Sequence, residues 1–239
     1  MKTVSNFFRF ERENADFPFY DRQSSLLSIW GSVFIFVSIV VGFLLFSYGI
    51  GGPLQPFMNV IFPLAAFVLV VRGQWKLLFR KLVLKDTILI IGTVVVNIIV
   101  TFIVAAIVSK LFGTNPNQAT EGPQPLSFFL KTIPMLFGEE LISILPFLII
   151  LKISVQYLKL SRKKGVILAV ILTALIFGAY HLPTYNWNIV QCILVIGTAR
   201  VILLYPYLKT KNIWTSTIAH IMNDWFIFSL AFLGTILGH

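Results

Sequence analysis

Long apolar runs dominate this sequence and constrain its fold more than any other feature. They occupy residues 26–48, 54–71, 87–108, 126–151, 166–182, 186–207 and 213–236. Each run is near the roughly 20 residues that a helix needs to cross a bilayer, although the second and fifth are short enough to be half-buried or re-entrant. Only 12% of the residues are charged, about half the share in soluble domains. The sequence predicts an all-α, polytopic transmembrane bundle of about seven spans, in a multi-pass protein of the cell membrane.

The net charge of +10 is distributed unevenly over the loops between these runs. The basic loops are 72–85, 152–164 and 209–211. The cation-poor loops are 49–53, 109–125 and 183–185. Cytoplasmic loops carry the excess of lysine and arginine, so this alternation places the N-terminus in the cytoplasm and the C-terminus outside. We attribute the charge to topology and expect no nucleic-acid partner.

The polar start of the chain differs from the rest. Residues 1–25 mix both charge signs and lack the pattern of a signal peptide, so we interpret them as a cytoplasmic N-terminal segment, partly helical on the surface. Residues 26–239 then form the transmembrane bundle. The basic segment 72–85 is either an amphipathic helix on the membrane surface or a plain loop. Cys192 is the single cysteine, so the chain has no internal disulfide.

Five ionisable residues stand inside the apolar runs, namely Glu139, Glu140, His181, His220 and Asp224. A charge at the bilayer centre costs about 2.5–3.5 kcal/mol on insertion scales, and such residues usually mark functional sites. The alternative is a polar network that only fixes helix packing. His220 and Asp224 share a helix face because they are four residues apart, whereas the two glutamates point about 100° apart.

The usual signatures of other intramembrane proteases are absent from the sequence. There is no Gly-x-Ser-x-Gly elbow, no Gly-x-Gly-Asp aspartyl pair and no His-Glu-x-x-His zinc motif.

Three motifs in order resemble those of the CPBP family. Glu139-Glu140, Phe177-x-x-x-His181 and His220-x-x-x-Asp224 are similar to its Glu-Glu-x-x-x-Arg, Phe-x-x-x-His and His-x-x-x-Asn/Asp motifs. The family contains the CAAX prenyl endopeptidases of the Ras-converting type and the bacterial Abi proteins, some of which act in bacteriocin self-immunity. The resemblance covers about residues 125–230.

The resemblance implies an intramembrane glutamate protease without an essential metal or other cofactor. Glu139 with His181 would activate a water molecule, and His220 with Asp224 would stabilise the oxyanion. The substrate would be a membrane-associated or prenylated peptide or protein, in bacteriocin immunity or in peptide processing. Asp224 could serve only if protonated or if it orients His220, because an oxyanion needs hydrogen-bond donors.

One position departs from the family pattern. Ile144 stands where the motif has its arginine, so Glu140 must be protonated, hydrated or paired with another span. Arg200 is the first candidate partner and Lys131 a weaker one. The competing expectation, which we favour slightly, is that Arg200 extends to the membrane interface instead.

Three other functions stay open on the sequence. The missing arginine allows a degenerate, non-proteolytic member that binds a peptide or partner. Histidines and carboxylates could also ligate zinc in a metal-dependent hydrolase. Buried ionisable residues also form proton or ion relays in transporters.

Overall fold

A computed structural model describes residues 7–12, 15–21, 26–118 and 126–237 of the chain. This part of the chain contains helices and no strands. Seven helical stretches are long and apolar enough to cross a membrane, so the prediction of a seven-span, multi-pass α-helical protein is confirmed. The spans are Ile29–Ser47, Gly52–Leu78, Leu84–Phe112, Leu126–Tyr157, Arg162–Tyr180, Ile189–Thr210 and Ile213–Gly234.

The labelled helices follow these spans, with short 3-10 and π-helical turns between them. The α-helices are α1 (Ile29–Ser47), α2 (Met58–Val71), α3 (Leu84–Phe112), α4 (Leu126–Lys152), α5 (Arg162–Tyr180), α6 (Ile189–Gln191), α7 (Gly197–Thr210) and α8 (Ile213–Leu237). The turns are η2 (Gly52–Phe57), η3 (Arg72–Leu78), η5 (Ile153–Tyr157), η6 (Pro183–Tyr185) and η7 (Cys192–Ile196).

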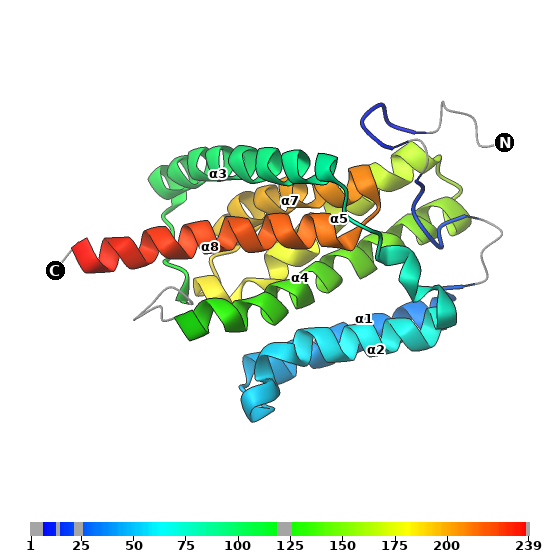
Figure 1. Cartoon of the computed structure of the whole chain (residues 1–239), viewed down its shortest axis with the longest axis horizontal. Coiled ribbons are helices and arrows are strands. Elements are labelled where there is room, and N and C mark those ends of the chain that lie inside the picture. The colour runs from blue at the N-terminus through cyan, green and yellow to red at the C-terminus, as the bar shows by residue number, and fades with distance from the viewer. Residues whose placement is uncertain (1–6, 13–14, 22–25, 119–125, 238–239) are drawn as a thin grey trace.

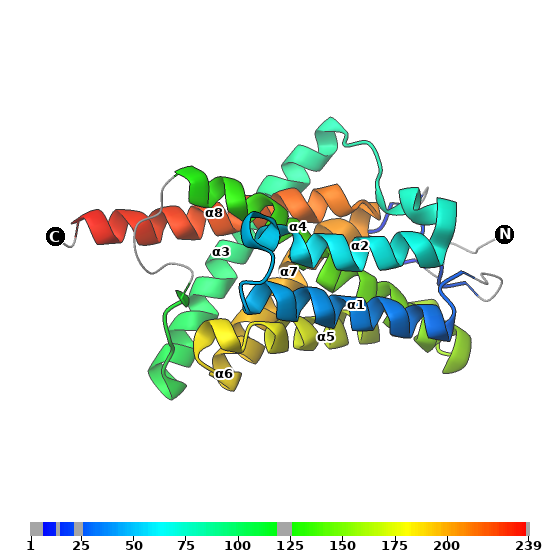
Figure 2. The same cartoon turned by 90° about the horizontal axis from the view of Figure 1, so that it is seen from below.

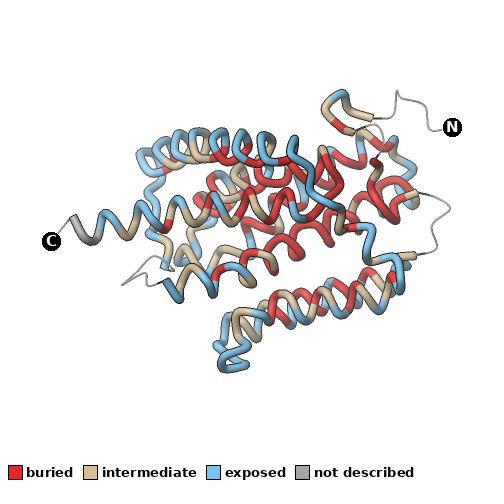
Figure 3. Tube along the Cα trace, in the orientation of Figure 1, coloured by how far each residue is buried: buried red, intermediate tan, exposed pale blue. Residues whose placement is uncertain are grey.

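Helix α4 is the centre of the bundle. It packs against α2, α5 and α8, while α3 packs against α7 and α8. Figure 1 shows α1 and α2 on one side of α4 and α3 on the other, and Figure 2 shows α3 running obliquely across the bundle. Burial is concentrated along α4 (Figure 3): 72% of the most apolar 18-residue stretch of its span is buried, against 17% for that of α1. Apolar side chains therefore cover the outer helices, as a lipid-facing surface requires.

Close helix contacts at two glycines fix the segments that carry the buried ionisable residues. A Cβ at Gly138 would lie 2.6 Å from the Cβ of Asn59 on α2, so only glycine lets α4 approach α2 here. A Cβ at Gly178 would lie 2.6 Å from the carbonyl oxygen of Cys192. These contacts hold the chain in place just before Glu139 and just before His181.

The N-terminal segment packs into the bundle instead of lying on its surface. Glu11 is 7% exposed and accepts hydrogen bonds from Arg162 at the start of α5 and from Lys211 between α7 and α8. The ring of Phe17 lies 5.1 Å from that of Phe147 on α4. No helix occurs in residues 7–12 and 15–21, so the expected surface helix is not found there. The remaining residues of the 1–25 segment lie outside the described part.

The basic segment 72–85 is not one amphipathic helix. It forms the 3-10 helix η3, then a non-helical stretch over 79–83, before α3 begins at Leu84. The carboxylate of Asp86 accepts a hydrogen bond from the backbone of Val83 and one from Arg12, which anchors the first turn of α3. The amphipathic-helix alternative is therefore wrong.

Candidate active site

The two glutamates lie in the middle of α4, and Glu140 has a buried partner. Its Oε1 lies 2.5 Å from Nη2 of Arg200 on α7, and Nη1 of Arg200 donates to Ser143 at 3.0 Å. Glu140 and Arg200 are both 0% exposed, so Arg200 pairs and does not extend to the membrane interface. The pairing hypothesis is confirmed and the interface alternative is wrong. Lys131, the weaker candidate, is exposed.

Glu140 also fixes the ring of His220 on α8. His220 Nδ1 lies 3.0 Å from Glu140 Oε1. Because a carboxylate only accepts, we assign a hydrogen to Nδ1. The second nitrogen, Nε2, then faces Oε2 of Glu139 at 3.8 Å and Oδ2 of Asp224 at 3.7 Å. His220 therefore turns one defined atom toward two further carboxylates.

His181 follows α5 and approaches Glu139 from another direction. Its Nδ1 lies 2.9 Å from the carbonyl oxygen of Phe177, which again assigns a hydrogen to Nδ1. Its Nε2 lies 3.6 Å from Oε2 of Glu139. The Phe177 ring packs between this histidine and the Arg200 guanidinium, at 4.4 Å from the His181 ring and 4.6 Å from Arg200 Cζ. The four-residue spacing of Phe177 and His181 thus has a structural reason.

Asp224 is the most accessible of the five residues, with a side chain that is 22% exposed. Its Oδ1 accepts a hydrogen bond of 3.0 Å from Nδ2 of Asn223. Asn223 in turn accepts a hydrogen bond of 2.9 Å from Asn97 on α3. The sequence analysis did not single out Asn97, although a lone amide in the middle of an apolar run was a signal that could have found it.

A cavity of about 250 Å³ adjoins the site. Its walls come from α3, α7 and α8 and from the ends of α5 and α6. The polar residues that line it are Asn97, Thr101, Asn117, His181, Tyr185, Gln191, Arg200, His220, Asn223 and Asp224. Both histidines line this cavity. Glu139 is not among the lining residues: its side chain, 8% exposed, lies beside the Nε2 atoms of both imidazoles.

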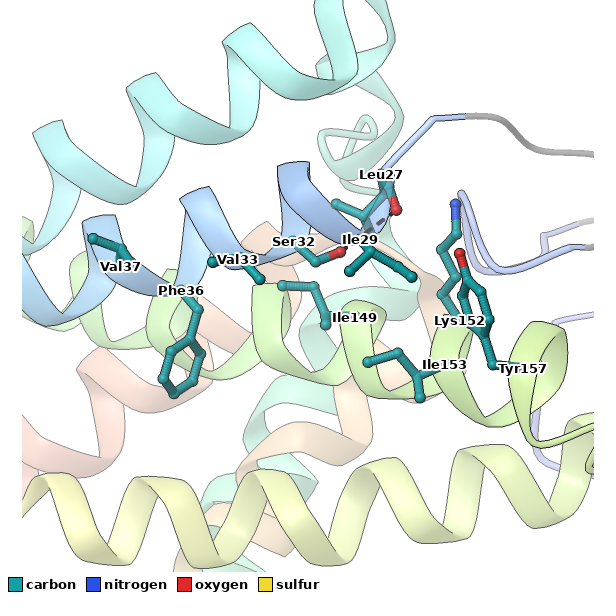
Figure 4. Close-up of a pocket in the computed structure, with 10 residues that line it drawn as sticks. All are labelled: Leu27, Ile29, Ser32, Val33, Phe36, Val37, Ile149, Lys152, Ile153 and Tyr157. Atoms are coloured by element: carbon teal, nitrogen blue, oxygen red, sulfur yellow. Dashed lines mark hydrogen bonds between the residues drawn. The ribbon is translucent and has the colours of Figure 1, made fainter.

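A second cavity, of about 260 Å³, lies between α1 and α4 and is distant from this chemistry. Figure 4 shows its lining, which is almost wholly apolar apart from Ser32, Lys152 and Tyr157. None of the five predicted site residues lines it.

The structure thus brings all five predicted residues into one connected group. Glu140 and Arg200 are the fully buried pair of this group. Glu139 lies between the two histidine Nε2 atoms, and Asp224 lies beside His220. Within the described residues, no group of three histidine, cysteine, aspartate or glutamate side chains is placed to hold a metal ion.

Comparison with known families agrees with this geometry. The family described as type II CAAX prenyl endopeptidase, Rce1-like, matches residues 17–226. The chain belongs to this Rce1-like family. The match begins well before the predicted core of about 125–230, so α1, α2 and α3 belong to the family unit too. No curated protein and no solved structure matches the chain. Membership places the chain among intramembrane endopeptidases at the level of the family.

Proposed function

We propose that this Rce1-like protein is an active intramembrane endopeptidase that hydrolyses a peptide bond of a membrane-associated or prenylated substrate. The observation that carries the proposal is the position of Glu139, whose Oε2 faces Nε2 of His181 at 3.6 Å and Nε2 of His220 at 3.8 Å. A buried carboxylate between two imidazoles is suited to general acid–base chemistry.

The Glu139–His181 separation favours a bridging water. A distance of 3.6 Å is too long for a direct hydrogen bond, and polar groups at such distances are commonly joined through water. With its hydrogen on Nδ1, neutral His181 presents a lone pair at Nε2. A water donating one hydrogen to His181 and one to Glu139 keeps its oxygen lone pairs free to attack a carbonyl carbon.

The proton that the water loses is carried by Glu139 to the leaving amine. Glu139 takes a proton from the water as the C–O bond forms, and the carbonyl becomes a tetrahedral oxyanion. Collapse of this intermediate breaks the C–N bond, and the proton held by Glu139 passes to the leaving amine. The products are a carboxylic acid and an amine, which become a carboxylate and an ammonium once the acid passes its proton to the amine, and no other reactant is required.

His220 supplies the donor for the oxyanion. Its Nδ1–H is bonded to Glu140, so a second proton on Nε2 gives an imidazolium, which Glu140, Glu139 and Asp224 surround. A donor fixed before the reaction stabilises the developing negative charge at low reorganisation cost. Asp224 accepts from Asn223 and therefore serves as a counter-charge for His220, not as a donor to the oxyanion.

The Arg200–Glu140 pair supports this proposal over a degenerate, non-proteolytic protein. The residue missing at Ile144 is a cation beside the second glutamate, and Arg200 supplies that cation from α7. A role in bacteriocin immunity or in peptide processing would use the same cleavage reaction.

The test is cleavage of farnesylated and unmodified CAAX peptides by the purified protein in lipid nanodiscs. The wild type should cleave the farnesylated peptide, and Glu139→Gln should abolish cleavage. Lys131→Gln, an exposed change on the same helix, is the matched control and should retain activity. Cleavage that persists in Glu139→Gln, or a wild type that cleaves neither peptide, would overturn the proposal.

Cleavage in the presence of chelators distinguishes the proposed mechanism from that of a metal-dependent hydrolase. Activity that survives EDTA and 1,10-phenanthroline supports the Glu139–His181 mechanism. Activity that these chelators remove and zinc restores would assign the reaction to a metal hydrolase.

A further inference from the structure

Helix α3 places one buried amide, Asn97, beside the site. Asn97 is 0% exposed and lies near the middle of α3, among apolar residues. Its Nδ2 donates to Oδ1 of Asn223 at 2.9 Å, and its Oδ1 accepts from the hydroxyl of Thr101 at 3.4 Å. Both ends of the amide are therefore engaged. Because the Thr101 hydroxyl can donate or accept, the direction of these amide hydrogen bonds is set by the Asp224 carboxylate, which only accepts.

The amide of Asn223 lies between Asn97 and Asp224. Its carbonyl oxygen accepts from Asn97, and its NH2 group donates to Oδ1 of Asp224 at 3.0 Å. If Asn223 flipped, two acceptors, its carbonyl oxygen and the Asp224 carboxylate, would face each other. Asn97 therefore holds Asn223 in the orientation in which it donates to Asp224.

Asp224 in turn faces the histidine that the proposed reaction uses. Its Oδ2 lies 3.7 Å from Nε2 of His220. The other charged groups near this ring are Glu139 and Glu140 on α4 and Arg200 on α7. Asp224 is the only carboxylate of the three whose orientation depends on α3.

We propose that Asn97 is a positioning residue of this site: through Asn223 it holds the Asp224 carboxylate beside Nε2 of His220. This inference rests on the proposed function, because it concerns the group that would donate to the oxyanion. Asn97 itself does not touch the reacting atoms in this arrangement.

A purely structural role makes a different prediction. Hydrogen bonds between membrane helices stabilise the fold modestly, so a packing role for Asn97 would affect stability alone. A positioning role requires that the effect of Asn97 on the reaction disappears once Asp224 can no longer act.

The kinetic test uses Asn97→Leu, which keeps the number and branching of the side-chain heavy atoms and removes the amide. We expect kcat to fall about tenfold, the cost of one hydrogen bond to a charged group, with KM nearly unchanged. Asn97→Gln should recover part of kcat. Thr93→Val is the matched control, since Thr93 is buried on the same helix and bonds only the carbonyl of Leu89.

Asn97→Leu is then repeated in an Asp224→Asn background. Under the proposal it causes no further loss of kcat there. The same tenfold loss in both backgrounds, or no loss in either, would overturn it. If Asn97→Leu does not fold, Asn97→Gln and Asn223→Ala take its place in the same comparison.

A second measurement does not depend on cleavage. In protein labelled with 15N-histidine, the ring signals report which nitrogens carry hydrogens, with His181→Asn and His239→Asn identifying the His220 signals. At pH 7, Asn97→Leu should lower the share of His220 protonated on both nitrogens, and Thr93→Val should not. An unchanged His220 signal overturns the inference. A changed signal in a wild type that cleaves no peptide keeps the inference and overturns the proposed function.

Discussion

Arg200 on α7 reaches Glu140 on α4 from sixty positions further along the chain, and both side chains are fully buried. The family motif places its arginine four residues after the second glutamate, one helical turn away. In this chain the position is Ile144, and the cation comes from another helix, α7. The chemical requirement, a cation beside the second glutamate, is met by tertiary packing instead of by helical spacing.

This pair should dominate the stability of the site. Glu140→Gln or Arg200→Gln alone should each lower the free energy of unfolding by about 3–5 kcal/mol, because each leaves an uncompensated buried charge. The double variant should lose much less than the sum of the two. Thermal unfolding in detergent, arranged as a double-mutant cycle, measures the coupling.

Arg72→Gln is the control for this cycle, since Arg72 is exposed at the end of α2. It should change stability little and should add independently to Glu140→Gln. Additive effects of Glu140→Gln and Arg200→Gln would mean that the two side chains are not coupled.

The spans and the five ionisable residues could be predicted because unpaired backbone groups and charged side chains are energetically costly inside a bilayer. A run of about 20 apolar residues has few alternatives to a spanning helix. A glutamate or histidine inside such a run is conspicuous for the same reason. The resemblance of the three motifs to those of the CPBP family then connected Glu139, Glu140, His181, His220 and Asp224.

The partners of these residues were harder to predict, because they depend on which helices pack together. Asn97 is neutral, so its burial is less costly and less conspicuous than that of a charge. Its bond to Asn223 joins residues 126 positions apart. Glu11 looked like part of a solvated segment, yet it pairs with Arg162 and Lys211, 151 and 200 positions away. No local pattern encodes such distances.

The glycine that precedes Glu139 should resist substitution. A Cβ at Gly138 would come within 2.9 Å of the backbone carbonyl carbon of Asn59, so α4 must shift away from α2. We expect Gly138→Ala to destabilise the fold by about 1–3 kcal/mol, the usual cost of overpacking. It should also lower peptide cleavage. The control is Gly92→Ala on α3, where nothing lies within 4 Å of the added Cβ.

Labelling would establish the membrane topology. The alternation of basic and cation-poor loops predicts that Gln118 lies outside and Lys163 inside. Single cysteines at these positions should react with an impermeant maleimide from opposite sides. The native Cys192 is 0% exposed and should stay unlabelled, so no cysteine-free background is needed. Reaction of both positions from one side would contradict the topology.

The N-terminal segment should make stability depend on pH through Glu11. Burial alone would raise the pKa of Glu11, but hydrogen bonds from Arg162 and Lys211 outweigh it and lower that pKa below its usual 4.5. A carboxylate whose pKa is lowered by folding contributes stability above its unfolded pKa and loses it as the pH falls through the folded value. At pH 7, Glu11→Gln should therefore lower the free energy of unfolding by about 3–5 kcal/mol, because it removes the carboxylate that pairs with the buried Lys211 and one of the two carboxylates that pair with Arg162, which keeps its bridge to Asp16.

Lys211, the partner of Glu11, should make stability depend on pH in the alkaline range as well. Burial lowers the pKa of Lys211 from 10.5 to about 8, although Glu11 opposes the shift. Between pH 8 and 10.5 the unfolded chain binds more protons at this lysine than the folded one, so the Lys211 contribution to stability rises with pH.

Thermal unfolding from pH 3.5 to 10 should show the stabilities of the wild type and Glu11→Gln converging below pH 4.5. Lys164→Gln, an exposed change nearby, should keep the wild-type profile. A constant gap between wild type and Glu11→Gln down to pH 3.5 would mean that Glu11 is not held as an ion by Arg162 and Lys211.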